Sequence, residues 1–193
     1  MDLVTSLDAA SVGLDTSPGI FDAQQLAILD PDPIIDYVDA RHRFPDGIFD
    51  DLVFLQASRK SIRSAHRPLD LPKQPSIDRV GIAFLRIDMA NPRMTTSAAM
   101  TWANEATHNV VDTDRQQCLR YLRRSPIELT DEQRNGCSSR GFVLIRHRGH
   151  GLGTGFVEST RPGDENCGHV RSLYPRAYSD DVARLSPFGH GDE

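Results

Sequence analysis

Hydrophobic and polar positions alternate along the chain in short periodic segments that predict both helices and strands. The first is DPDPIIDYVDARHRF, residues 30–44, where we expect a helix capped by Asp32 that begins with Pro33 and ends before Pro45. Three of its residues lie at helical spacing: Ile35, Val38 and His42. The chain therefore opens its folded part with a helix.

Strand patterns follow this helix. Residues 51–69 predict two short strands around a turn at Ser58 to Lys60, and the apolar run DRVGIAFLRID, residues 78–88, predicts a third strand. A helix is then expected over 95–107, capped by Thr95 or Thr96. We expect this first half to mix helix and sheet.

The short apolar piece NVVD leads to a third expected helix, a basic one, over 113–124, for which Thr113 is the expected cap. An apolar stripe is expected at Cys118, Leu119 and Leu122. Four arginines fall on the solvent side of this helix: Arg115, Arg120, Arg123 and Arg124.

Only strand-like runs follow, namely GFVLIRH, LGTGFVES and HVRSLYP. Helices and strands that precede an all-β part predict an α+β protein with two small domains. The expected organisation is a flexible acidic leader (1–28), an α+β module (29–124), a linker rich in Pro, Gly, Asn and Ser (125–139), a small β-barrel (140–186) and a tail (187–193).

Charge is distributed unevenly along the 193 residues. The formal net charge is −5, of which residues 1–51 carry −9 (11 Asp, 2 Arg) and residues 52–193 carry +4 (16 acids, 20 bases). No run of about 18 apolar residues predicts a membrane span, and the acidic start differs from a secretory signal, so we expect a cytoplasmic location. The basic body is compatible with an RNA partner.

The glycine-rich stretch FVLIRHRGHGLGTGFV, residues 142–157, has two interpretations. A phosphate-binding G-x-G-x-x-G loop must follow a strand and open a helix, yet Phe156 stands where the last glycine is needed and a strand pattern follows. A tight hairpin fits better, since glycine adopts the positive φ angles of such turns. We further expect Gly153 and Gly155 to allow close approach of another backbone.

The sequence contains no convincing catalytic or metal motif. It lacks a G-x-S-x-G elbow, and His147 with His150 has no second pair at ligand spacing. Three cysteines form no CxxC pair and are expected to be ordinary reduced thiols: Cys118, Cys137 and Cys167. We expect no catalytic residues, no metal and no cofactor.

Two stretches resemble known RNA-associated modules. Residues 141–157, followed by HVRSLYPRAY, resemble the PUA-like domain at the C-terminus of Sun-type (RsmF-like) 5-methylcytosine RNA methyltransferases. The matching positions are Arg146, Gly149, Leu152, Gly153, Gly155, Arg171, Tyr174, Pro175 and Arg176. Residues 36–124 resemble the α+β module that precedes the PUA-like domain in pre-PUA ribosome-biogenesis factors. There the matching positions are Thr96, Trp102, Ala106, Asn109 and Val110.

The resemblance implies RNA binding without the family's chemistry. Its enzymes carry an S-adenosylmethionine-binding Rossmann domain and catalytic cysteines in a Pro-Cys context, and this chain has no Pro-Cys dipeptide. We expect a stand-alone protein that recognises structured tRNA or rRNA, in RNA modification or ribosome biogenesis, beside a methyltransferase subunit or a ribosomal precursor. Two alternatives stay open. One is a catalytic or accessory subunit of an RNA cytosine methyltransferase that binds S-adenosylmethionine, and the other is a protein-interaction adaptor.

The expected RNA contacts are arginines and one aromatic ring. A guanidinium holds phosphate bidentately, and a tyrosine ring can stack on an exposed base. The expected contacts are Arg146, Arg148, Arg171, Tyr174 and Arg176 on the barrel and Arg120, Arg123 and Arg124 on the preceding helix. The competing interpretation places Tyr174 in the core and the arginines on an ordinary solvated surface.

Overall fold

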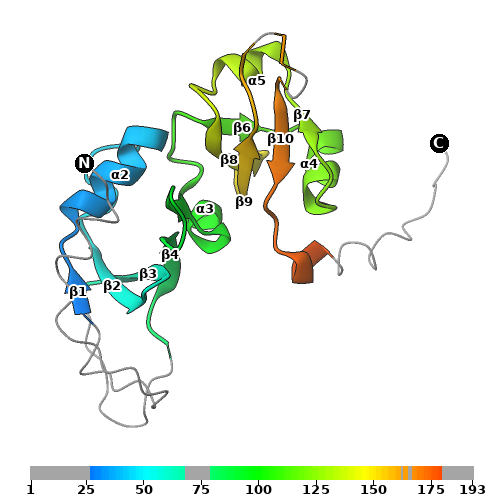
Figure 1. Cartoon of the computed structure of the whole chain (residues 1–193). Coiled ribbons are helices and arrows are strands. Elements are labelled where there is room, and N and C mark those ends of the chain that lie inside the picture. Colours follow the sequence, from blue (N-terminus) through cyan, green and yellow to red (C-terminus); the bar gives the residue numbers. More distant parts are fainter. Residues whose placement is uncertain (1–26, 68–78, 162, 165–166, 180–193) are drawn as a thin grey trace. The chain divides into compact units, whose positions relative to one another are not determined.

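Two separate sheets organise the chain, and each belongs to its own unit (Figure 1). The structure, a computed structural model, describes residues 27–67, 79–161, 163–164 and 167–179. Unit 1 ends at Thr95 and unit 2 begins at Thr96. The expected tail and nearly all of the expected leader lie outside the described residues.

In its described residues, unit 1 is an antiparallel meander with one helix. Its strands, in sheet order, are β1 (Ala27–Leu29), β2 (Leu52–Ser58), β3 (Ser61–His66), β4 (Ile82–Arg86) and β5 (Arg93–Met94). The predicted hairpin around residues 58–60 and the predicted third strand are confirmed. Phenylalanine rings fill the interior: Phe54 and Phe84 lie 4.9 Å apart between centroids, and Phe49 lies 5.6 Å from Phe84.

Helix α2 (Asp32–His42) ends before Pro45, as predicted. Its N-cap is Pro31 rather than Asp32, and no side chain caps it. The buried stripe is Ile34, Val38 and His42, so Ile34 takes the core position expected for Ile35. These three residues are spaced four apart, so they lie on one face of the helix, and that face packs into the core.

Unit 2 combines helices with a mixed sheet that curls into a half-barrel. Its helices are α3 (Thr96–Trp102), α4 (Arg115–Leu122) and α5 (Asp131–Asn135). Its strands, in sheet order, are β6 (Val110–Asp112), β8 (Gly141–His147), β9 (His150–Val157), β10 (His169–Ser172) and β7 (Ile127–Glu128). Strand β6 is parallel to β8, and the other pairs are antiparallel. The predicted α+β class, with an α+β module ahead of a curled sheet, is thereby confirmed.

The division between the units falls earlier than the expected start of the barrel. Helices α3 and α4 and strand β6 belong to unit 2. Residues 125–139, expected to be a linker, instead contain β7 and α5. The reason is that Ile127 and Cys137 are buried in the core of unit 2, and that Thr130 and Gln133 form a capping box that starts α5.

Helix α4 differs in phase from the expected apolar stripe. Its N-cap is Asp114, whose side chain accepts a hydrogen bond from Gln117, and the residues it buries are Gln117 and Tyr121. Leu119 remains 41% exposed. Tyr121 takes the core position because its hydroxyl donates to the carbonyl of Thr154 at 3.0 Å, which satisfies the buried polar atom.

Candidate functional site

The glycine-rich stretch forms the β8–β9 hairpin, as predicted. His147 pairs with His150 across a two-residue turn in which Arg148 and Gly149 both have positive φ, 51° and 75°. Two positive φ angles are the signature of the turn that matches the twist of a hairpin. Strand β9, not a helix, directly follows the turn, so the turn does not have the geometry of a phosphate-binding loop.

Two glycines of β9 permit close contacts that a side chain would block. A Cβ at Gly151 would lie 2.3 Å from the carbonyl oxygen of Ala99, so the backbone of α3 packs directly on the strand. A Cβ at Gly153 would lie 2.5 Å from the hydroxyl of Tyr121. We expected a close backbone approach at Gly153 and Gly155, but the nearest atoms there belong to the side chains of Tyr121 and Val170, and the close backbone approach lies at Gly151.

Arg146 is engaged within unit 2. It is the register partner of Asp112 on the parallel strands β8 and β6, and its Nε and Nη2 donate to the two carboxylate oxygens at 2.5 and 2.7 Å. This hydrogen bonding raises the pKa of Arg146 above its ordinary value. Its Nη1 faces the carbonyls of Ala103 and Asn104 at 3.4 Å. The Arg146 side chain therefore links β8 to β6 and to the residues that follow α3.

Tyr174 is half-buried against the core rather than presented to solvent. Its ring lies 5.5 Å from that of Tyr121, edge to face, and 6.0 Å from that of Tyr178. Its carbonyl accepts a hydrogen bond from Arg124. Tyr178 is the exposed ring of the group, at 54%. These contacts favour the core interpretation of Tyr174.

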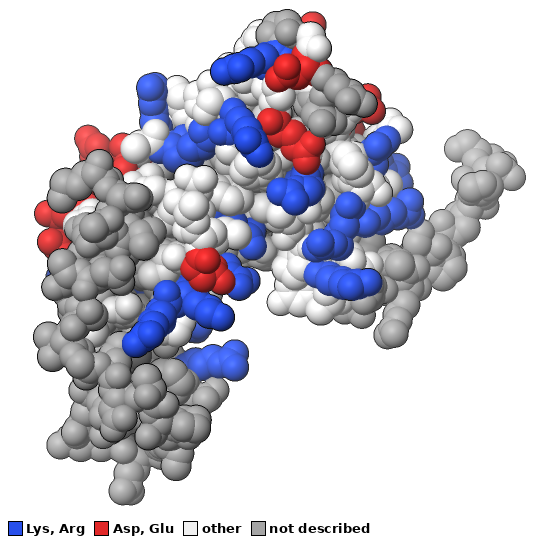
Figure 2. Space-filling view, in the orientation of Figure 1, with Lys and Arg blue, Asp and Glu red and all other residues white. Residues whose placement is uncertain are grey.

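The basic side chains of α4 lie on the surface. Arg115, Arg120, Arg123 and Arg124 are all exposed. Arg120 donates to the carbonyl of Pro126 at 2.8 Å, which orients its guanidinium along the end of the helix. Figure 2 shows basic side chains gathered around α4. Of the expected barrel contacts, Arg148, Arg171 and Arg176 are also exposed.

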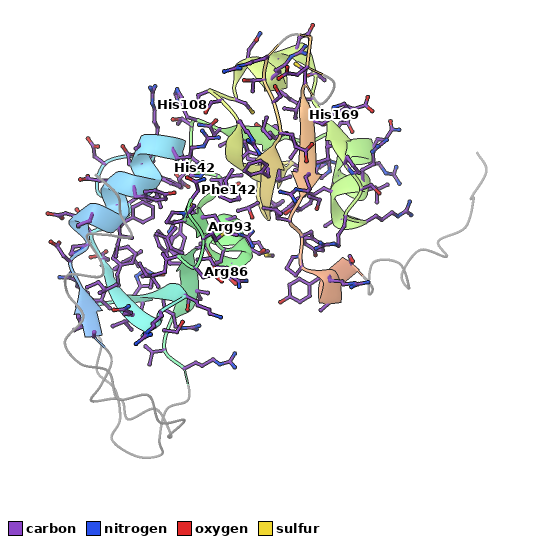
Figure 3. All side chains as sticks on the ribbon, viewed as in Figure 1. His42, Arg86, Arg93, His108, Phe142 and His169 are labelled. Atoms are coloured by element: carbon purple, nitrogen blue, oxygen red, sulfur yellow. The ribbon has the colours of Figure 1, made fainter. Side chains whose placement is uncertain are left out.

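Strands β8, β9 and β10 carry an aromatic and basic row that sequence reasoning missed. Phe142 on β8 (Figure 3) and Phe156 on β9 are register partners with ring centroids 5.2 Å apart. The guanidinium carbons of Arg140 and Arg171 each lie 5.5 Å from the centroid of Phe156. The sequence signal that could have revealed this row is the alternation of side chains along a strand, because it places both rings on the face opposite Val143.

The three cysteines form no disulfide. Cys137 is buried, and burial together with the carboxylate of Asp114 raises the pKa of the Cys118 thiol. Within the described ranges, no three His, Cys, Asp or Glu side chains gather in a group that could hold a metal ion. None of the described helices has the length and apolar character needed to cross a membrane.

Comparison with known proteins gives one family match. Residues 108–161 match the family model described as the methyltransferase RsmF PUA domain. The match runs from just before β6 to just beyond β9, and it includes Arg146, Arg148 and the aromatic pair. The resemblance found in the sequence is thereby confirmed for this part of the chain. None of the curated proteins matches the chain.

Proposed function

We propose that this protein, which carries an RsmF-type PUA domain over residues 108–161, binds structured RNA through unit 2. The match carries the proposal because the domain comes from a family of RNA-modifying enzymes and is not its catalytic part. We further propose that the RNA is tRNA or rRNA, and that the protein acts in RNA modification or ribosome biogenesis in the cytoplasm.

The exposed arginines of α4 support this proposal. Phosphate contacts are made by cations that reach solvent, and Arg115 and Arg120 on α4 and Arg123 at its C-terminal end do so. An arginine fork also matches the geometry of a phosphate. We assign the phosphate contacts to these side chains and to Arg124, Arg148 and Arg176, and we propose Arg171 on β10 as a further RNA contact.

Arg146 and Tyr174 take different roles in the proposal from those first expected. The two-point ion pair of Arg146 with Asp112 favours a structural role in joining β6 to β8. The packing of Tyr174 on Tyr121 favours a structural role for that ring too. RNA would then contact the side chains around Arg146 and Tyr174. Substitutions of Arg146 or Tyr174 would weaken RNA binding by destabilising unit 2.

The test is binding of the full chain to a tRNA and to an rRNA hairpin across a salt series. We expect affinity to fall steeply with salt, because each neutralised phosphate releases counterions. The double variant Arg115→Gln with Arg120→Gln should lower the slope of log affinity against log salt by about 1 for each phosphate that is no longer neutralised. Arg86→Gln is the matched control, since Arg86 lies on unit 1 and is paired with Asp88 at 2.9 Å.

Absent or salt-independent binding would overturn the proposal, and so would a double variant that binds like the wild type. A rise in melting temperature with S-adenosylmethionine would instead support the methyltransferase-subunit alternative, because a ligand that binds the folded state stabilises it.

A further inference from the structure

Four planar side chains form one row across one face of the sheet of unit 2. Phe156 on β9 is the register partner of both Phe142 on β8 and Arg171 on β10. Arg140 lies just before β8, and its guanidinium carbon is 5.5 Å from the ring centroid of Phe156, the same distance as that of Arg171. The row, defined by these four residues, thus crosses three strands.

The row lies opposite the hydrophobic core. Side chains alternate along a strand, and Val143 and Val157, the neighbours of the two phenylalanines, are both buried in the core of unit 2. The two rings are only half-buried, and the Arg171 side chain is 62% exposed. Leu144 and Thr154, the next residues on the same face as the two rings, are buried, so this face is covered along part of its length and the row lies where it is only partly covered.

A cross-strand aromatic pair by itself stabilises a sheet. The two guanidiniums beside the same ring add something that a sheet does not require, namely further flat surfaces and positive charge. Nucleobases stack on aromatic rings and on guanidinium planes, while their phosphates attract the charge. Bases inside a duplex are covered by their neighbours, so such a row suits a base that is unpaired.

We propose that this row binds an unpaired nucleobase of RNA by stacking. The inference rests on the proposed RNA-binding function and specifies which part of the RNA unit 2 recognises. Glu158 lies 3.8 Å from Arg171 and offsets part of its charge, so Arg171 acts mainly as a flat stacking partner. Arg140, which is exposed, supplies the phosphate contact. The arginines of α4 hold paired regions of the RNA.

The experiment measures binding of the full chain to an RNA hairpin with an unpaired loop and to a blunt duplex of the same stem. Phe156→Leu keeps an apolar side chain but removes the ring. We expect it to weaken binding to the looped RNA by about tenfold or more, as for loss of one stacked base, and to leave duplex binding and the salt slope unchanged. Arg171→Lys keeps the charge but removes the flat guanidinium, and it should act in the same direction.

Abasic nucleotides in the loop provide the matching change on the RNA. For the wild type, one abasic position should reproduce the loss caused by Phe156→Leu, and the two changes together should cost little more than either alone. This measurement also decides the matter if Phe156→Leu fails to fold, because an RNA whose abasic loop positions all bind normally contradicts stacking.

The outcomes separate the two proposals. If the wild type binds neither RNA, RNA binding itself is refuted. If it binds both RNAs, and a folded Phe156→Leu and Arg171→Lys bind the looped RNA as tightly as the wild type does, only the stacking row is refuted. The stacking row would also be refuted if the fold-losses in affinity from Phe156→Leu and from the abasic position simply multiplied when combined. Such independent effects would mean that the ring and the base do not touch.

Discussion

Arg146 and Asp112 are paired twice, once as register partners on parallel strands and once through a two-point ion pair. Strand β6 is only three residues long and lies at the edge of the sheet of unit 2. A second bond to the same edge comes from the hydroxyl of Thr113, which donates to the carbonyl of Arg146 at 2.9 Å. Side chains thus supplement the few backbone bonds that β6 can make.

Arg146→Ala is expected to lower the free energy of unfolding by about 1 kcal/mol. The value is modest because Asp112 is 59% exposed and solvent screens the pair, although the geometry is bidentate. Urea unfolding measures the loss. Arg115→Ala, which removes an exposed arginine at the start of α4, should change stability by less than about 0.5 kcal/mol. Equal losses in both variants would contradict the structural role of Arg146.

Gly151→Ala should destabilise unit 2 by at least about 2 kcal/mol, because the new methyl group would overlap the backbone of α3 at Ala99. Gly149 offers a matched comparison, since no atom lies within 4 Å of a Cβ placed there and only its φ of 75° resists substitution. Gly149→Asn should therefore cost well under 1 kcal/mol, because asparagine tolerates this backbone region. Thermal unfolding of the two variants distinguishes packing from backbone strain.

Gln133→Ala should cost about 1–2 kcal/mol. Its side chain completes the capping box of α5 and also donates to the carbonyl of Asp112 at 2.6 Å and to the side chain of Gln117 at 2.9 Å. Gln133→Glu retains the cap acceptor but loses both donated bonds, so it separates the two contributions by urea unfolding. If Gln133→Glu matches the wild type, the donated bonds contribute nothing.

Cys118 should react slowly with iodoacetamide at neutral pH, with a midpoint at higher pH than that of a cysteine in a short peptide. Burial and the carboxylate of Asp114 both raise its pKa, and only the thiolate reacts. Because the folded thiol holds its proton longer than the unfolded one, this group's contribution to stability declines as pH rises past the ordinary thiol pKa. Peptide-resolved mass spectrometry follows the reaction, and an ordinary midpoint would contradict the shift.

The sequence predicted the helices and strands better than it predicted the residues that they contact. Alternation and turn glycines were enough to find the β8–β9 hairpin, since both are local properties of the chain. The phase of α4 was missed because Tyr121 is buried through a hydrogen bond with Thr154, 33 residues away. Strand β7 was missed because two residues give no measurable period, although Thr130 and Gln133 do carry a readable capping signal.

The candidate site also has a part that the sequence predicted and a part that depends on residues distant in sequence. Exposed arginines on α4 follow from helical spacing and were predicted. The engagement of Arg146 was not, because its partner Asp112 comes next to it only through the parallel pairing of β6 with β8. The row at Phe156 needs three strands in register, and register between strands far apart in sequence is set by packing rather than by local pattern.

The packing of α3 on Gly151 sets the smallest piece of the chain worth expressing alone. A fragment cut at the edges of the family match, residues 108–161, would lack both α3 and β10. It would leave the backbone of β9 bare where Ala99 and Ala103 now cover it, and would open the β9 edge that β10 now pairs. The segment matched by the family model is thus shorter than the segment that packs as one unit, which extends at least from Thr96 to Ser172.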